Sequence, residues 1–227
     1  AIPAVLMGAT PVTAADHVDV LGIDIDNLTM EEALAAILIT LKSPEPAQVC
    51  FVNADCANIT CRDREYLEVL KGASLTLADG IGMRLAGKIL GQPIRENVNG
   101  TDLFPRLSDA LSRTGQGLYL LGGRPGIAEG VAQWLQEHYP QLVISGTHHG
   151  YFSTAEEPDV IAEIARSEAA VLMVAFGAPK QDQWIARNLA ATRVKVAMGV
   201  GGLFDFYSGN IPRAPQWMRE VNAEWLY

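Results

Sequence analysis

Short apolar runs alternate with amphipathic stretches along most of the chain. The apolar runs cover residues 49–53, 74–78, 117–122, 142–146, 170–177 and 194–200. Several are apolar at consecutive positions, which is typical of strands that are covered on both faces. They predict a sheet whose strands are mostly buried.

The stretches between the runs carry apolar residues at helical spacing. They cover residues 63–71, 81–90, 101–113, 125–139, 156–167 and 179–190. A further helix is predicted over 27–42, where Thr29 and Glu32 form a capping box. Pro105 fits its helix if it falls in the first turn. Strict alternation of strand and helix predicts a doubly wound α/β fold, a mostly parallel Rossmann-like sheet with helices on both faces.

The length and charge of the chain narrow its possible functions. With 227 residues, the chain is long enough for one substantial domain, which we place at residues 20–227 after a loose segment at 1–19. A net charge of −9 argues against binding of nucleic acid, which requires clustered cations. Any nucleotide bound here is expected to be a small molecule.

The cysteines and the start of the chain indicate a cytoplasmic protein. Cys50, Cys56 and Cys61 are odd in number and match no zinc spacing, so we interpret them as reduced, buried structural thiols. The first fifteen residues lack the basic start of a secretory signal. No apolar run approaches the roughly 20 residues that span a bilayer.

Ligands of doubly wound sheets bind at the carboxyl ends of the strands. Asn53 and Asp55 follow the first apolar run; Asp55 either caps the next helix or serves the site, whereas the Asn53 amide suits a sugar hydroxyl. Asp79 stands before Gly80 and Gly82. It is either a helix cap or a general base that the glycines leave accessible to a substrate.

Two later strand ends carry candidates for nucleotide binding. Gly123 and Arg124 lie in GGRPG before a helix, a place that suits an anion, although the G-x-G-x-x-G pattern is missing. Tyr151 follows His148 and His149; it either stacks on a base or covers the core. The two histidines point to opposite sides of an extended segment, which disfavours a shared metal.

The last strand ends add three candidates. Lys180 and Gln181 begin a helix after Pro179, where they suit a phosphate or base contact or simply a solvated first turn. Asp205 lies among glycines and either binds ribose hydroxyls or closes a turn. Near the start, the D-x-D of residues 24–26 is interpreted as capping and turn chemistry, not as a metal site.

Eight segments together resemble the WecG/TagA/CpsF family of bacterial glycosyltransferases, from about residue 20 to the end. They are FVNADCANI, LADGIGMRLAGKILG, NVNGTDLFPRL, LLGGRPGIAEGVA, GTHHGYF, FGAPKQDQWI, GVGGLFDFYSG and RAPQWMREVNAEWLY. The resemblance implies an inverting enzyme that moves N-acetylmannosamine or a relative from a UDP-sugar. The acceptor would be a sugar on undecaprenyl diphosphate, in the synthesis of surface polysaccharide or teichoic acid.

The resemblance also implies roles for individual residues. Asp79 matches the family's proposed catalytic base. Tyr151 and Gln181 match positions at the uracil, Asp205 one at the ribose, and Asn53 one near the sugar. Helix N-termini, aided by Arg124 or Lys180, would stabilise the departing diphosphate. We therefore expect no required cofactor and no metal.

Three departures from the family pattern matter. Phe51 stands where some members have a Thr, and Asn97, itself a candidate substrate contact, where many have an Arg. These changes leave UDP-glucose and a UDP-linked N-acetylmannosamine uronate open as donors. Relatives commonly continue past Tyr227 into a basic, membrane-associating tail.

This ending suggests a chain that lacks its tail. The whole protein would then lie on the inner face of the cell membrane. Residues 213–227 would pack on the sheet as an amphipathic helix, and an exposed apolar remnant would favour a homo-oligomer. Two alternatives remain: a Rossmann oxidoreductase that binds NAD, and an inactive binding module with the same fold.

Overall fold

The computed structural model describes residues 17–209. The helix expected at 213–227 lies outside this range, as does most of the segment expected to be loose. The first strand begins at His17, so residues 17–19 belong to the folded domain and not to the loose segment.

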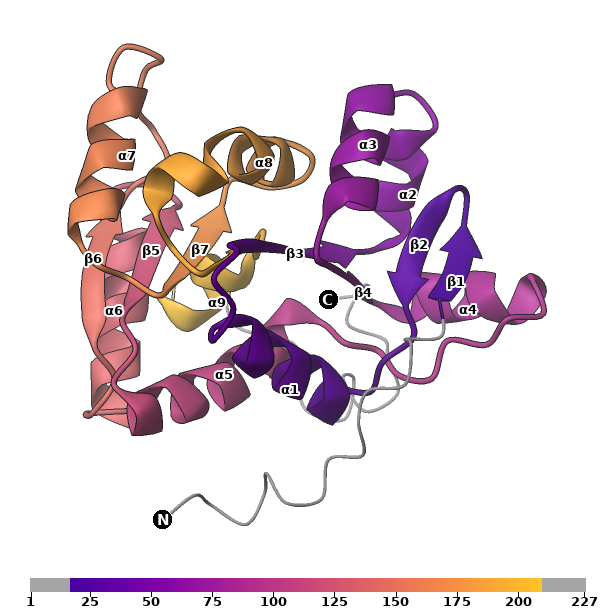
Figure 1. The fold of residues 1–227 in the computed structure, drawn as a ribbon, viewed down its shortest axis with the longest axis horizontal. Coiled ribbons are helices and arrows are strands. Elements are labelled where there is room, and N and C mark those ends of the chain that lie inside the picture. The colour runs from indigo at the N-terminus through magenta and orange to yellow at the C-terminus, as the bar shows by residue number, and fades with distance from the viewer. Residues whose placement is uncertain (1–16, 210–227) are drawn as a thin grey trace.

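One eight-stranded sheet runs through the described part of the chain (Figure 1). Its strands are β1 (His17–Val20), β2 (Ile23–Asp26), β3 (Ala47–Val52), β4 (Leu75–Ala78), β5 (Leu118–Gly122), β6 (Ile144–His148), β7 (Val171–Ala175) and β8 (Val196–Gly199). Their order is β1-β2-β4-β3-β8-β7-β5-β6. The β1–β2 hairpin is antiparallel, and the other pairs are parallel. The predicted doubly wound fold is confirmed.

Helices cover both faces of the sheet. They are α1 (Met30–Thr40), α2 (Ala54–Thr60), α3 (Arg64–Gly72), α4 (Ile81–Ile89), α5 (Gly100–Thr114), α6 (Ile127–His138), α7 (Glu157–Arg166), α8 (Lys180–Thr192) and α9 (Leu203–Tyr207). Helices α1, α5, α6 and α9 contribute to one core. Helices α2, α3, α7 and α8 contribute to the cores of the opposite face.

Strand β3 shows how the apolar runs produce these layers. All six of its residues are buried. Val49 and Phe51 join the core under α1 and α5, whereas Cys50 and Val52 join the core under α2 and α3. Successive side chains of a strand point to opposite faces, so a central strand must be apolar at every position.

Helix α1 begins as the sequence predicts. Thr29 Oγ1 accepts a hydrogen bond from Glu32 N at 3.3 Å, and Glu32 Oε2 accepts one from Thr29 N at 2.8 Å. The capping box therefore satisfies two backbone donors that the helix itself cannot pair.

The expectation for Pro105 is wrong. Helix α5 begins at Gly100, which makes Pro105 its sixth residue and places it beyond the first turn. Proline has no N–H to give to the carbonyl four residues earlier, which belongs to Thr101. The Tyr207 hydroxyl donates to that Thr101 carbonyl at 2.9 Å. The carbonyl that Pro105 leaves without a backbone donor is thus the point at which α9 attaches to α5.

The D-x-D segment lies in strand β2, so its interpretation as turn and cap chemistry is also wrong. Asp26 Oδ2 accepts a hydrogen bond from Thr76 N at 2.7 Å, which adds to the pairing of β2 with β4. Burial raises the pKa of Asp26. Within residues 17–209, no three His, Cys, Asp or Glu side chains gather as metal ligands.

The cysteines are all free. Cys50 and Cys56 are buried as expected, but Cys61 is exposed, so the prediction of burial is wrong for that residue. Its place at the C-cap of α2 leaves it at the surface.

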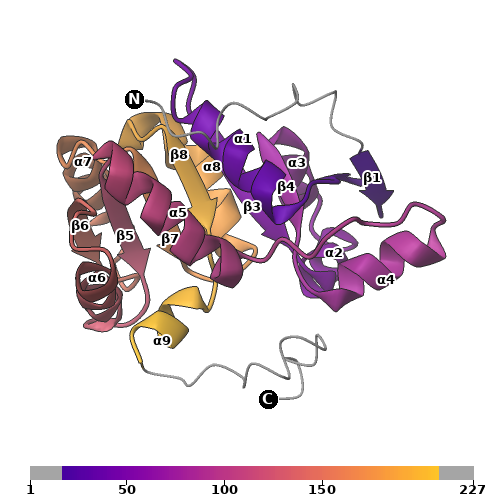
Figure 2. The same cartoon turned by 90° about the horizontal axis from the view of Figure 1, so that it is seen from below.

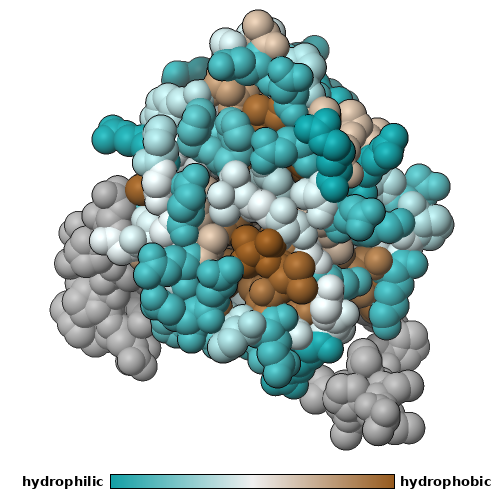
Figure 3. Space-filling model, turned by 90° about the vertical axis from the view of Figure 1, so that its left-hand side faces the viewer, coloured by the Kyte–Doolittle hydropathy of each residue, from teal (hydrophilic) through white to brown (hydrophobic). Residues whose placement is uncertain are grey.

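The carboxyl ends of the parallel strands meet along one edge, where α9 and α4 also lie (Figure 2). The side of the molecule that carries β6 shows mainly hydrophilic side chains around a small hydrophobic patch (Figure 3). No helix within residues 17–209 has both the length and the apolar character needed to cross a membrane.

Candidate active site

A cavity of about 240 Å³ opens at the carboxyl ends of β3, β4 and β8. It is bordered by the starts of α2, α5, α8 and α9. Its lining residues are Phe51, Asn53, Cys56, Asp79, Gly100, Thr101, Ala178, Gln181, Gly199, Val200, Gly201, Gly202, Leu203 and Phe206. Three predicted site residues, Asn53, Asp79 and Gln181, meet here from separate strand ends.

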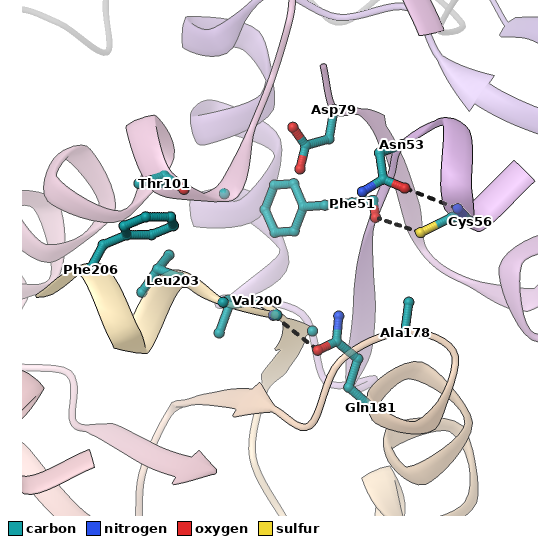
Figure 4. Close-up of a pocket in the computed structure, with 14 residues that line it drawn as sticks. Phe51, Asn53, Cys56, Asp79, Thr101, Ala178, Gln181, Val200, Leu203 and Phe206 are labelled. Atoms are coloured by element: carbon teal, nitrogen blue, oxygen red, sulfur yellow. Dashed lines mark hydrogen bonds between the residues drawn. The ribbon is translucent and has the colours of Figure 1, made fainter. Parts of the chain in front are cut away.

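Asp79 follows β4 and presents its carboxylate to the cavity (Figure 4). Its backbone N–H donates to Val52 O at 2.8 Å, which fixes it beside the end of β3. The N-cap of α4 is Gly80, with no side-chain cap bond. Asp79 stands one residue before that N-cap, and its half-buried side chain borders the cavity.

Each of the two glycines after Asp79 meets a requirement of the backbone or of packing. Gly80 has a φ of +87°, a conformation that residues with a Cβ rarely adopt. At Gly82 a Cβ would approach the Cβ of Ala54 to 2.9 Å. The glycines thus allow a sharp turn and close packing of α4 on α2, which holds Asp79 at the rim.

Asn53 is the N-cap of α2, a role that the sequence analysis considered for Asp55. Its Oδ1 accepts a hydrogen bond from Cys56 N at 2.9 Å. With the oxygen held by the backbone, the amide nitrogen points toward the cavity (Figure 4). Asp55 is exposed and does not line the cavity.

Gln181 is held in the same way on the opposite side of the cavity. Its Oε1 accepts hydrogen bonds from Gly177 N at 3.1 Å and from Gly201 N at 2.9 Å. These bonds join the loop after β7 to the loop after β8 and leave Nε2 facing the cavity (Figure 4). Asn53 and Gln181 therefore offer N–H donors, which suit the oxygen atoms of a sugar or a phosphate.

Asn97 does not line the cavity. Its Oδ1 accepts a hydrogen bond from Gly80 N at 2.6 Å. This bond fixes the turn that directly follows Asp79; the expected contact of Asn97 with the substrate stays a prediction.

A buried polar cluster lies beneath this site. Asp182, only 1% exposed, accepts a hydrogen bond from the Tyr66 hydroxyl at 3.0 Å, and its backbone carbonyl accepts one from Gln48 Nε2 at 2.9 Å. Its other carboxylate oxygen, Oδ1, has no hydrogen-bond partner in the described structure. Burial raises the pKa of Asp182 to about 6. Asp182 was not among the predicted site residues; its burial beside Tyr66 depends on a contact between distant parts of the chain.

Four other predicted residues form a second group, over the ends of β5, β6 and β7. Gly123 N donates to Ala175 O at 3.2 Å and Gly150 N donates to Gly123 O at 2.8 Å, which brings Arg124 and Tyr151 near the end of β7. Lys180 Nζ lies 5.1 Å from the centroid of the Phe176 ring. Gly123, Arg124, Tyr151 and Lys180 do not line the cavity.

Asp205 lies on α9 and does not line the cavity either, whereas its neighbours Leu203 and Phe206 do. The sequence analysis also missed Cys56 and Thr101. Cys56 is buried, and burial raises the pKa of its thiol. The position of Thr101 directly after the N-cap Asn99 and Gly100 was the one signal that could have suggested it.

Charge is sparse in the cavity. Among the described lining residues, Asp79 is the one acid, and there is no Lys, Arg or His. Phe51, Val200, Leu203 and Phe206 add apolar surface. The arrangement can remove a proton from a neutral hydroxyl and hold oxygen-rich groups through amide donors.

Comparisons with known proteins agree with this chemistry. The sequence model described as "Glycosyl transferase WecG/TagA/CpsF family" matches residues 18–227. A Staphylococcus aureus (strain MRSA252) protein is 32% identical over 212 residues, which are 92% of this chain and 83% of the relative. A Bacillus subtilis (strain 168) protein is 31% identical over 181 residues, or 80% of this chain and 70% of the relative. Both are named N-acetylglucosaminyldiphosphoundecaprenol N-acetyl-beta-D-mannosaminyltransferase.

The sheet is doubly wound, and a carboxylate lies in the cavity at the carboxyl ends of β3, β4 and β8. Together with these matches, this arrangement defines an enzyme that transfers a hexose. The oxidoreductase alternative receives no support from the family match or from these relatives. The chain belongs to the WecG/TagA/CpsF family of glycosyltransferases.

Proposed function

We propose that the protein transfers N-acetylmannosamine, or a closely related hexose, from a UDP-sugar to a sugar carried on a polyprenyl diphosphate. The anomeric configuration inverts during the transfer. The names of the relatives in S. aureus and B. subtilis, which specify this sugar and a diphosphoundecaprenol acceptor, support the proposal. The observation that carries it is the placement of Asp79 in one cavity with the amides of Asn53 and Gln181.

The chemistry requires one base. An acceptor hydroxyl attacks the anomeric carbon while Asp79 takes the hydroxyl proton. The bond from that carbon to the phosphate oxygen breaks, and UDP leaves with the electron pair. A single displacement of this kind inverts the anomeric centre, and a positioned carboxylate contributes about 10²- to 10⁴-fold to such a step.

The two groups of residues would divide the donor between them. The sugar and the nearer phosphate would occupy the cavity, where the Asn53 and Gln181 amide groups donate to oxygen. The uridine would extend toward Tyr151, with Arg124 and Lys180 beside the diphosphate. Because neighbouring strands lie about 4.8 Å apart, the three steps from β8 to β6 span roughly 14 Å, which an extended nucleotide sugar can bridge. In this proposal Gln181 contacts the sugar or diphosphate end, not the uracil.

The donor sugar is a separate part of the proposal. Phe51 presents a ring to the cavity close to Asp79 (Figure 4), so this wall offers no hydroxyl and no cation to the sugar. A neutral sugar suits such a wall better than an acidic one, because a second carboxylate near Asp79 would be repelled. We therefore place UDP-N-acetylmannosamine first, UDP-glucose second and the uronate third. The product would serve cell-surface polysaccharide or teichoic acid synthesis at the cytoplasmic side of the membrane.

A donor and acceptor screen tests the proposal. The three UDP-sugars are each incubated with a short-chain polyprenyl diphosphate that carries N-acetylglucosamine, and product is followed by mass spectrometry with and without EDTA. We expect transfer from UDP-N-acetylmannosamine that EDTA leaves unchanged. Exposed Asp55→Asn is the control for Asp79→Asn. Absence of transfer from every UDP-sugar would refute the proposed function. Equal rates in Asp55→Asn and Asp79→Asn would refute Asp79 as the base.

A further inference from the structure

Helix α4 carries an exposed apolar stripe. Ile81, Leu85 and Ile89 are 46%, 56% and 76% exposed. Their spacing of four places them on one side of the helix. Leu90, at the C-cap, adds a further apolar side chain at the end of the helix and is 52% exposed.

The other side of α4 is anchored to the protein. Met83 and Gly87 are buried, and Ala86 packs against the core formed by β1, β2, α2 and α3. The helix also contacts β1. Figures 1 and 2 both place α4 beside the β1–β2 hairpin, at the end of the molecule opposite β6. Because the buried side is fixed, the stripe cannot turn inward.

Two cations accompany the stripe. Arg84 and Lys88 are both exposed and lie four residues apart, beside Leu85 and Ile89 on the outward surface. Residues 81–90 contain no acid, although the whole chain has a net charge of −9. A helix with an apolar stripe and a basic flank is typical of segments that lie in the interface of an anionic bilayer.

The position of α4 ties this surface to the reaction. Its N-cap, Gly80, directly follows Asp79, and the hydrogen bond from Gly80 N to Asn97 Oδ1 fixes that junction. Both α4 and the cavity lie at the carboxyl edge of the sheet. A surface that rests on α4 would therefore stand beside the catalytic carboxylate.

We propose that the α4 stripe, formed by Ile81, Leu85 and Ile89, together with Leu90, Arg84 and Lys88, docks the protein on an anionic membrane. This inference rests on the proposed function, because a polyprenyl-linked acceptor is held at a membrane surface. A second copy of the chain is a poorer occupant. A two-fold contact centred on α4 would bring the cations of both copies together, whereas anionic headgroups neutralise them.

Vesicle flotation tests the proposal on the full chain. Vesicles of phosphatidylcholine with 30% phosphatidylglycerol (about the anionic share needed for a strong surface potential) are compared with vesicles of phosphatidylcholine alone. We expect the unaltered protein to float with the anionic vesicles and to be released by salt. The double variant Leu85→Glu/Ile89→Glu should bind at least about tenfold more weakly.

Arg84→Glu/Lys88→Glu should lose the preference for anionic lipid, because each cation near the surface contributes about 1 kcal/mol, or roughly fivefold in binding. Ile39→Glu is the matched control, since Ile39 is 59% exposed on α1, away from the stripe. Unchanged flotation of Leu85→Glu/Ile89→Glu would overturn the proposal. The proposal would also be overturned if the unaltered protein bound neither type of vesicle and Leu85→Glu/Ile89→Glu lost self-association, measured by sedimentation velocity.

Transfer assays separate this proposal from the proposed function. Leu85→Glu/Ile89→Glu should retain its rate on a water-soluble short-chain acceptor and lose it on a long-chain acceptor embedded in vesicles. Equal loss on both acceptors would show that the stripe acts through the cavity and would overturn membrane docking. If the unaltered protein transfers to neither acceptor, the proposed function fails, while the flotation result still decides the role of α4.

Discussion

The two halves of the carboxyl edge are built differently. At β4, β3 and β8, one carboxylate and two amides surround a cavity, and each amide oxygen is already held by backbone N–H groups. At β5, β6 and β7, the candidate side chains are exposed: Arg124, Tyr151 and Lys180. The polar groups of the first half are held in place before a substrate binds, which favours catalysis of bond formation. The side chains of the second half are exposed, which leaves them accessible to a nucleotide.

The sharpest way to break this comparison is to remove the base. Asp79→Asn should lower kcat by about 10²- to 10⁴-fold, or about 3–5 kcal/mol, because an amide cannot accept the acceptor's proton. The dissociation constant for UDP, measured by calorimetry, should change little, because the uridine lies in the other half. A large loss of UDP binding would show that the two halves do not divide the donor in this way.

The buried acid under the first half predicts a dependence of stability on pH. The pKa of Asp182 rises from an ordinary 3.8 to about 6 on folding, so its contribution to stability is complete below about pH 4 and is lost as the pH rises through about 6. Asp182→Asn abolishes this loss. The difference in free energy of unfolding, Asp182→Asn minus unaltered protein, should increase by up to roughly 3 kcal/mol between pH 4 and pH 8.

Urea unfolding at both pH values measures this difference, with exposed Asp55→Asn as the control. A constant difference between Asp182→Asn and the unaltered protein across this range would mean that Asp182 does not titrate there.

Changing amide nitrogen to oxygen tests the preorganised donors. Gln181→Glu keeps an acceptor for Gly177 N and Gly201 N but replaces the N–H donor with a charged oxygen. It should weaken UDP-sugar binding by about 10- to 100-fold with a nearly unchanged Tm. Gln181→Ala should lower both the affinity for the UDP-sugar and the Tm. Asn53→Asp is the matched change on the other wall, since Asp can also cap α2. Unchanged binding of the UDP-sugar in both acidic variants would show that the two amide groups do not donate hydrogen bonds to it.

The smallest effect is expected in the open half. Tyr151→Ala should weaken UDP binding by about 5- to 20-fold, the lower part of the about 1–3 kcal/mol that stacking on a base contributes, because the ring is exposed, and should leave kcat within about twofold. Tyr151→Phe keeps the ring and should bind as the unaltered protein does. A kcat loss in Tyr151→Ala as large as that of Asp79→Asn would remove the distinction between the halves.

Sequence reasoning succeeded where the signal was local or periodic. The capping box at Thr29 and the consecutive apolar residues of β3 report directly on hydrogen bonds and burial. It failed where partners are distant in the chain. Pro105 is accommodated because Tyr207, about a hundred residues later, donates to Thr101, and nothing near Pro105 announces that bond.

The candidate site divides in the same way. Asn53, Asp79 and Gln181 were predicted from strand ends, and parallel strands bring such ends to one edge. Their orientations were not predictable. The oxygen of Asn97 holds Gly80, and Asp182 is buried beside the Tyr66 hydroxyl; neither arrangement follows from the neighbouring residues in the chain.

By itself, the sequence determined the alternation of strands and helices from residue 49 to residue 200 and the polar residues at those strand ends, because apolar periodicity and turn chemistry are properties of neighbouring residues. Only the tertiary structure decided which of those ends share a cavity. It also decided which acids are desolvated, and that α4 exposes its apolar stripe while anchored through Met83. Strand order and helix packing set these outcomes, and both depend on contacts between segments far apart in the chain.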